Sequence, residues 1–95
     1  MIIVYAKCVV SGQNRAEFLK RAGELVENTR KEPGNASYQL VQSREAKNIY
    51  AFVEQWPSQE ALDRHMQMTH FQKSVDAISK VIEGKLEITT HEIVL

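Results

Sequence analysis

The stretch NIYAFVEQWPS, residues 48–58, decides the fold because it contains a strand, the end of that strand and the start of a helix. Aromatic and β-branched residues dominate from Asn48 to Trp56, as in strands. Alternation places four side chains on one face of this strand: Tyr50, Phe52, Glu54 and Trp56. Pro57 and Ser58 then begin a short helix, with Ser58 as its N-cap.

Upstream of this stretch, the pattern predicts two strands and a helix. Residues 36–43 form the preceding strand, and the charged turn 44–47 joins it to the strand at 48–56. β-Branched residues dominate from Ile2 to Val10, which form the first strand. Between these strands, a capping-box pattern at Asn14 opens an amphipathic helix that ends at Pro33-Gly34.

Downstream, the pattern predicts two helices and a final strand. The helix after Ser58 has an inward face made by Ala61, Leu62, His65 and Met66. A second capping-box pattern at Thr69 predicts a new helix from about His70, which Gly84 is placed to stop. Its apolar stripe comprises Phe71, Val75, Ile78 and Ile82. The last strand is expected at residues 86–95.

The order is therefore β-α-β-β-α-β, with the second helical region split in two. This order predicts an α+β protein of the ferredoxin-like, split β-α-β class, with an antiparallel sheet and helices on one face. We expect residues 1–95 to form a single domain. The first strand is apolar on both faces, which indicates that a partner sheet covers the side that the helices leave open.

Composition excludes several classes of function. The chain has 95 residues, of which 43% are hydrophobic and 25% are charged, with a formal net charge of zero. This balance argues against binding nucleic acid or an anionic membrane surface. A single cysteine, Cys8, has no partner for an internal disulfide, and no apolar stretch approaches the length of a membrane span. We expect a cytoplasmic protein.

Few residues carry a chemical signal of their own. His65 falls on the inward face of its helix, where it is either a hydrogen-bonded core histidine or a base that faces a pocket. Glu54 interrupts an aromatic face, so its carboxylate must be paired, hydrogen-bonded or turned toward a wet cavity. His70, at the start of the next helix, is expected to be solvated or to cap that helix.

A metal site is not expected. Glu54, His65 and His70 have the ligand types of a two-histidine, one-carboxylate iron centre. However, His65 and His70 are five residues apart across a helix break, a spacing that does not bring them together by helical geometry.

Several short segments, taken in order, resemble a known family. The segments are Glu32-Pro33-Gly34, the strand carrying Tyr38, Glu54-Gln55-Trp56-Pro57-Ser58, Ala61-Leu62, His65 and His70-Phe71. Together they resemble the antibiotic biosynthesis monooxygenase family, and within it the small quinol monooxygenases. The resemblance implies a homodimeric α+β barrel in which two sheets pack face to face. It also implies oxidation of a small aromatic substrate by O2 without flavin, haem or metal.

The resemblance also suggests roles for individual residues. His65 would deprotonate or hydrogen-bond the phenolic oxygen, Trp56 would form part of the pocket wall, and Glu54 would orient His65 or the substrate. The predicted substrate-binding residues are Tyr38, Phe52, His70 and Phe71.

Two other functions fit the same residues. An isomerase of a small phosphorylated carbonyl compound, of the phospho-autoinducer-2 type, would use His65 and Glu54 to move protons. It would need a cation near the phosphate, for which Lys7 and Arg64 are the candidates. A dimeric module that only binds a small molecule would use the same pocket without chemistry.

Overall fold

The computed structural model has the predicted order of strands and helices, with a short 3-10 helix, η1, added before the first helix. The elements are β1 (Ile2–Val9), η1 (Gly12–Asn14), α1 (Arg15–Arg30), β2 (Ser37–Gln42), β3 (Ile49–Trp56), α2 (Gln59–Met66), α3 (Thr69–Ser79) and β4 (Glu83–Glu92). None of the helices combines the length and the apolar character needed to cross a membrane.

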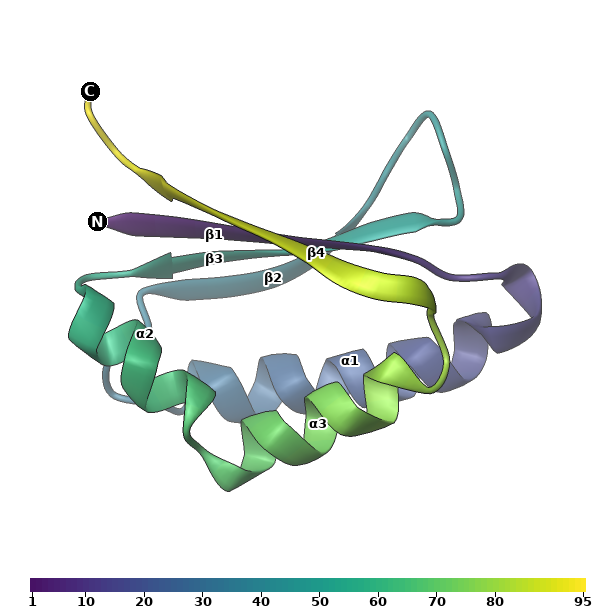
Figure 1. Cartoon of the computed structure of the whole chain (residues 1–95), viewed down its shortest axis with the longest axis horizontal. Helices are drawn as coiled ribbons and strands as arrows, with labels where there is room; N and C mark the ends of the chain where they lie inside the picture. The colour runs from purple at the N-terminus through teal and green to yellow at the C-terminus, as the bar shows by residue number, and fades with distance from the viewer.

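The four strands form one antiparallel sheet in the order β2-β3-β1-β4. Helices α1 and α3 run under one face of this sheet, and α2 lies at the end where the chain termini are found (Figure 1). This is the ferredoxin-like fold. The register pairs Glu54 with Val4 on one side and with Tyr38 on the other. These three side chains therefore form a row on the helix-facing side of the sheet.

The core fills the space between the sheet and the helices. The ring of Phe18 in α1 packs at a tilt against Tyr50 and edge-on against Phe52, with centroid distances of 5.1 and 6.5 Å. Phe18, Trp56 and Ile78 have no exposed surface. Burying an apolar side chain of this size stabilises the fold by about 1.5–3 kcal/mol.

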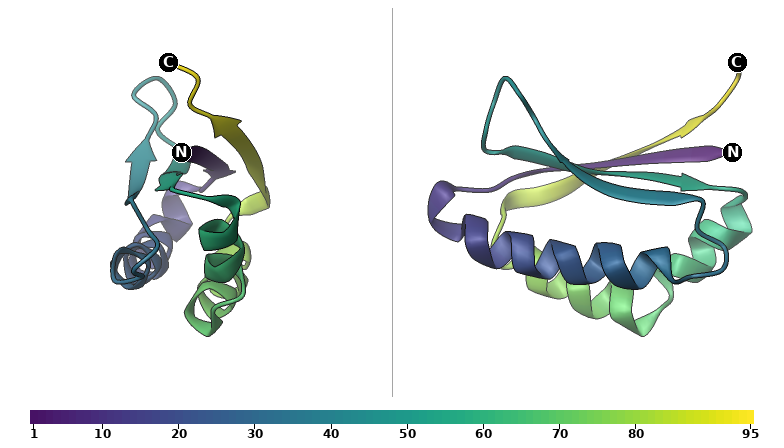
Figure 2. Two further views of the ribbon diagram at one scale, coloured as in Figure 1. Left: turned by 90° about the vertical axis from the view of Figure 1, so that its left-hand side faces the viewer. Right: turned by 180° about the vertical axis from the view of Figure 1, so that it is seen from behind.

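No helix covers the outer face of the sheet (Figure 2). Its side chains alternate with the buried ones. The apolar ones come from β1, β2 and β3 and comprise Ile3, Tyr5, Val9, Val41, Ile49 and Val53, whereas β4 contributes polar side chains such as Thr89 and His91. Tyr5 is 38% exposed and Val41 is 42% exposed. One apolar face of β1 therefore lies in the core, and the other lies on the side of the sheet that no helix covers.

The helix starts differ in part from the capping predictions. The Ser58 hydroxyl accepts a hydrogen bond from the Ala61 amide at 3.1 Å, so this N-cap is confirmed. The hydrogen bonds predicted for the two capping boxes are absent. Asn14 is the N-cap residue of α1, as predicted, but its side-chain amide donates to the Val81 carbonyl at 3.4 Å and makes no cap. Thr69 lies inside α3, whose N-cap is Met68.

The last helix and strand also lie earlier than predicted. Helix α3 ends at Ser79, so Gly84 does not stop it, and Ile82 lies outside the helix. Gly84 instead has a φ of +70° near the start of β4. Glycine adopts this left-handed conformation without the steric cost that a Cβ would add, and it lets the chain turn directly from α3 into the edge strand.

Candidate active site

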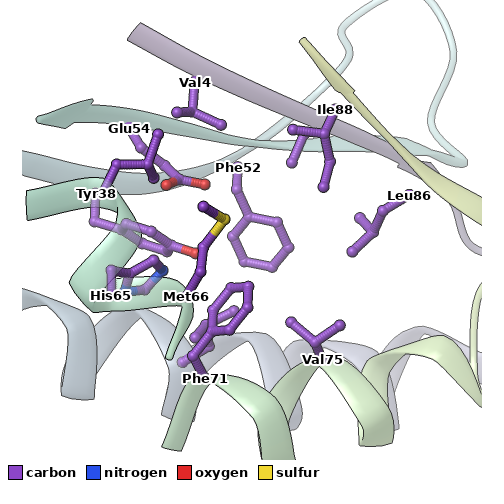
Figure 3. Close-up of a pocket in the computed structure, with 13 residues that line it drawn as sticks. Val4, Tyr38, Phe52, Glu54, His65, Met66, Phe71, Val75, Leu86 and Ile88 are labelled. Carbon is purple, nitrogen blue, oxygen red and sulfur yellow. The ribbon is translucent and has the colours of Figure 1, made fainter. Parts of the chain in front are cut away.

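A small cavity lies between the sheet and helices α2 and α3 (Figure 3). Its volume is about 70 Å³, and its lining comprises Val4, Ala6, Leu25, Tyr38, Phe52, Glu54, Leu62, His65, Met66, Phe71, Val75, Leu86 and Ile88. Met66 and Ile88 are 43% and 58% exposed, so the cavity opens between α2 and β4. Only Tyr38, Glu54 and His65 bring side-chain nitrogen or oxygen atoms to this otherwise apolar lining.

Two short polar contacts beside the cavity join one carboxylate to two histidines. Oε2 of Glu32 lies 2.8 Å from Nδ1 of His65 and 2.7 Å from Nε2 of His70. The side chains of Glu32 and His65 are 6% and 1% exposed, and that of His70 is 21% exposed. We call these residues the Glu32–His65–His70 triad. An ionised carboxylate only accepts hydrogen bonds, so both rings donate to it.

Two tight turns bring the triad together. Helix α1 ends at Arg30, and the Glu32 amide donates to the Thr29 carbonyl at 2.9 Å, which turns the carboxylate back under the sheet. Helix α2 ends at Met66, and the Met68 amide donates to the His65 carbonyl at 3.1 Å. The chain reverses at this point, so the His65 and His70 rings meet with their centroids 5.9 Å apart.

His65 sits in an aromatic enclosure. Its ring lies 4.6 Å from the Trp56 ring, 4.6 Å from the Phe71 ring and 5.6 Å from the Tyr38 ring. Burial lowers the pKa of His65 below its ordinary value, although the hydrogen bond and the charge of Glu32 oppose this shift. The imidazole is therefore neutral near pH 7, with its proton on Nδ1 and a lone pair on Nε2.

The Nε2 atom of His65 is buried and has no hydrogen-bond partner. An unpaired buried polar atom costs about 1–3 kcal/mol and is rare in folded proteins, so its presence calls for an explanation. A ligand hydroxyl that reaches this atom would satisfy it. His65 is one of the residues that line the cavity, so a ligand hydroxyl bound there would lie beside its ring.

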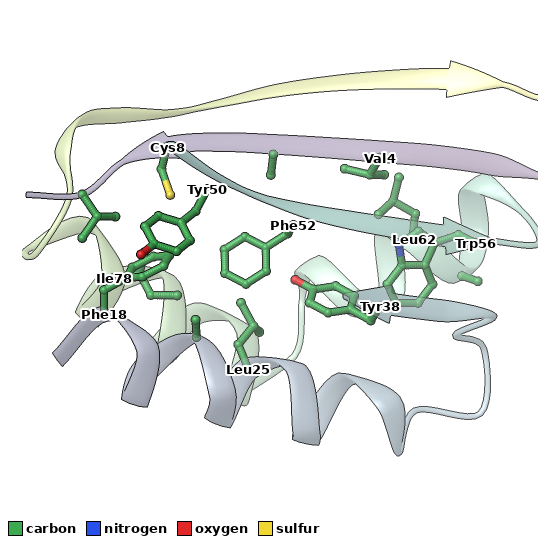
Figure 4. Close-up of a cluster of buried hydrophobic side chains, with 14 residues drawn as sticks. Val4, Cys8, Phe18, Leu25, Tyr38, Tyr50, Phe52, Trp56, Leu62 and Ile78 are labelled. Atoms are coloured by element: carbon green, nitrogen blue, oxygen red, sulfur yellow. The ribbon is translucent and has the colours of Figure 1, made fainter. Parts of the chain in front are cut away.

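Glu54 is the second buried polar group of the cavity. Its Oε1 accepts a hydrogen bond of 2.9 Å from the Trp56 indole, which fixes both side chains. Burial raises the pKa of Glu54 to about 7, although the bond from Trp56 opposes the shift. Burial, followed by the nearby charge of Glu54, raises the pKa of Tyr38 above its ordinary value, so this phenol stays protonated. Tyr38, Phe52 and Trp56 occupy adjacent parts of the core (Figure 4).

The triad also has the donor types of a two-histidine, one-carboxylate metal centre. One donor atom from each of Glu32, His65 and His70 lies within 4.8 Å of the other two. Here the two ring nitrogens share a single carboxylate oxygen through short hydrogen bonds. A divalent cation would take the place of these hydrogen bonds, with each imidazole carrying its proton on its other ring nitrogen. In this structure the cluster is a hydrogen-bonded triad.

Comparison with known proteins identifies the family. Residues 1–77 match the family model described as antibiotic biosynthesis monooxygenase. The chain belongs to this family. One relative, from Bacillus subtilis (strain 168), is named "Putative monooxygenase YcnE". It is 31% identical to this chain over 93 residues, which cover 98% of each chain.

Solved structures agree with the family assignment. A conserved protein from Methanosarcina mazei Go1 is 30% identical and superimposes with a TM-score of 0.92, over 95% of this chain and 89% of that one. A structure described as an antibiotic biosynthesis monooxygenase is 28% identical, with a TM-score of 0.92 and full coverage of both chains.

In this antibiotic biosynthesis monooxygenase family member, the residues predicted from sequence fall into two groups. His65, Glu54, Tyr38, Phe52 and Phe71 line the cavity. The other two, Trp56 and His70, lie behind it: Trp56 against His65 and Glu54, and His70 against Glu32.

Two points about the triad differ from the sequence interpretation. His65 and His70 were expected to stay apart, but the reversal after α2 brings them to the same carboxylate oxygen. That carboxylate belongs to Glu32, whereas Glu54 bonds Trp56. Glu32 stood in a segment that resembles the family, but nothing in its spacing connected it with His65, which is 33 residues away.

Proposed function

We propose that the protein is a cofactor-independent monooxygenase that oxidises a quinol or a related phenol with O2, with His65 as the base. Membership of the antibiotic biosynthesis monooxygenase family supports oxygen chemistry. The observation that carries the proposal is the buried, unpartnered Nε2 of His65 beside an aromatic cavity, with Nδ1 anchored by Glu32.

The geometry suits removal of a proton from a phenol. A neutral imidazole with a free lone pair on Nε2 accepts the hydroxyl proton. The carboxylate of Glu32, 2.8 Å from Nδ1, holds the ring in the required tautomer and stabilises the positive charge that develops on it. A positioned base of this kind contributes about 10²–10⁴-fold to the rate.

Deprotonation makes the substrate itself the electron donor. A quinol dianion or phenolate is far more electron-rich than the neutral phenol and can reduce O2 directly. One oxygen atom is inserted into the ring and the other leaves as water, and the quinol supplies all four electrons as it becomes a hydroxyquinone. The apolar lining holds the reacting ring away from water.

The shape of the cavity fits the edge of an aromatic ring. A cavity of about 150 Å³ holds benzene, whereas the enclosed space here is about 70 Å³. We propose that the ring enters with its hydroxyl toward His65 and extends outward between Met66 and Ile88, the most exposed side chains of the lining. Glu54 and Tyr38 supply polar contacts beside the base, and Phe52 and Phe71 supply the aromatic walls.

A second copy of the chain is proposed to cover the outer face of the sheet. That face carries apolar side chains and no helix. A homodimer formed by packing the two sheets together would remove these side chains from water, and each protomer would keep its own cavity on the helix side.

The alternative functions have less support. An isomerase of a phosphorylated substrate requires a cation beside the phosphate, and no lysine or arginine lines the cavity. Arg64 lies instead at a separate surface hollow, and Lys7 lies on the opposite face of β1 from Val4 and Ala6. A module that only binds its ligand would show ligand-dependent thermal stabilisation without turnover.

Oxygen uptake by the protein, after dialysis against a chelator, tests the proposal with a panel of quinols that includes menadiol. Quinols autoxidise, so the background is set by the His65→Ala variant. The control variant is Lys20→Ala, which changes an exposed side chain of α1, away from the cavity and from the outer face of the sheet. Native and K20A protein should consume O2 at equal rates well above H65A. Coincident traces for all three proteins would refute the proposed function.

A further inference from the structure

A hollow on the surface lies beside Glu32 of the triad. Its lining residues are Glu32, Pro33, Gly34, Ala61, Arg64 and Met68. No residue is shared between this hollow and the cavity. Glu32 lines the hollow, His65 lines the cavity, and the 2.8 Å hydrogen bond between them spans the wall that separates the two spaces.

The two oxygens of Glu32 have different surroundings. Oε2 accepts both histidine hydrogen bonds. Oε1 makes no hydrogen bond within the chain and is not fully buried, so it keeps contact with solvent. One carboxylate therefore touches the buried base through one oxygen and water through the other.

Apart from its hydrogen bond to Glu32, the His65 ring is enclosed by other side chains. The ring is 1% exposed and is enclosed by Trp56, Tyr38 and Phe71. Nε2 is itself buried, and a substrate in the cavity would separate the ring from water that enters by the cavity mouth. If the proton stays on the imidazole, it can return to the phenolate before O2 reacts.

We propose that Glu32 is a proton relay that carries the substrate proton from His65 through the wall to water in the hollow, by a route separate from the substrate entrance. This inference rests on the proposed function, because it assumes that His65 removes a phenolic proton. Nε2 accepts the proton from the substrate oxygen, Nδ1 gives its own proton to Oε2 of Glu32, and Glu32 releases a proton to water. The reverse transfers return one proton to the reduced oxygen and restore the starting tautomer of His65. The substrate supplies the second proton of the water that leaves.

Two substitutions at Glu32 separate a relay from a residue that only positions His65. Glu32→Gln keeps an oxygen that can accept the Nδ1 hydrogen bond, but the amide cannot carry the proton. Glu32→Ala removes the side chain and opens the wall between the hollow and Nδ1. We expect both variants to lose about 100-fold in kcat, as for loss of a positioned proton-transfer group.

Chemical rescue with formate then tests the route. Formate should restore kcat at least tenfold in E32A, where a small carboxylate can replace the missing one. It should not restore E32Q, where the amide fills the space. Since formate is expected to enter from the hollow, it should not compete with the quinol.

Arg64 lies at the hollow with its side chain 63% exposed, so E32A/R64E should need about threefold more formate at low ionic strength. Arg44 lies in the exposed turn between β2 and β3, so E32A/R44E is the matched control and should behave like E32A.

Three results would overturn the relay: E32Q within threefold of native kcat, E32A without rescue, or competition between formate and quinol. Circular dichroism confirms folding of each variant, and E32Q keeps the test available if E32A does not fold. If native protein shows no oxygen uptake with any quinol, that result would instead refute the proposed function, and the relay with it.

Discussion

Replacing Glu54 with glutamine should remove much of the dependence of stability on pH between pH 5 and 8. Glu54 is 5% exposed, and burial raises its pKa from an ordinary 4.5 to about 7. Glutamine is nearly the same size, and its amide oxygen can accept the 2.9 Å hydrogen bond from the Trp56 indole. The substitution therefore removes the ionisation and keeps the contact.

The size of the effect follows from the difference in pKa between the folded and unfolded chains. A shift from 4.5 to about 7, at 1.36 kcal/mol per pKa unit, corresponds to about 3 kcal/mol. Between these pH values the folded protein holds a proton on Glu54 that the unfolded chain has lost. The free energy of unfolding therefore falls as the pH rises, and the loss is complete above the folded pKa.

Urea unfolding of native and E54Q protein at pH 5, 6, 7 and 8 measures this difference. His65 has a lowered pKa, so its contribution changes with pH in the opposite direction, but it is present in both proteins and cancels in the comparison. Relative to native protein, E54Q should gain about 2.5 kcal/mol between pH 5 and pH 8, because part of the loss has already occurred at pH 5. Two curves that stay parallel within about 1 kcal/mol would refute a strongly shifted, buried Glu54.

Three further predictions concern the base, the dimer and metals. The acid limb of the kcat/KM profile should have its midpoint below pH 6.5, because burial lowers the pKa of His65 and the base must be neutral; a midpoint above 6.5 would point to another group. Tyr5→Glu, on the outer face, should convert a dimer to a monomer in sedimentation. Lys7→Glu, on the same strand, should weaken the dimer less, because the native residue at that position is already charged. Dialysis against EDTA should change oxygen uptake less than about twofold; a loss that Zn²⁺ or Fe²⁺ restores would assign the triad as a metal site.

Local patterns in the sequence were sufficient for the fold. Strand alternation at residues 49–56 and the Ser58 cap appear in the structure because both depend on neighbours within a few positions. The capping boxes failed because capping depends on where the backbone first becomes helical. Helix α1 is preceded by a 3-10 turn, so Asn14 is already inside helical structure and its side chain bonds Val81, 67 residues away.

The cavity residues could be predicted where a face of a strand or helix determined them. His65 lies on the inward side of α2, and Glu54 lies on the aromatic face of β3. The triad could not be predicted, because it depends on two chain reversals after helices α1 and α2. Helical spacing places His70 far from His65, yet the turn at Met68 brings the two rings together. Glu32 carried no signal beyond its place in a segment that resembles the family.

Incorporation of oxygen from ¹⁸O2 tests the central claim most directly, with mass spectrometry of the quinone formed from a substrate that the native protein turns over. A monooxygenase that uses His65 as its base should place one ¹⁸O atom in the new hydroxyl group, at a rate that falls at least about 100-fold in H65A. A product without ¹⁸O, or equal labelling rates with native and H65A protein, would contradict the account.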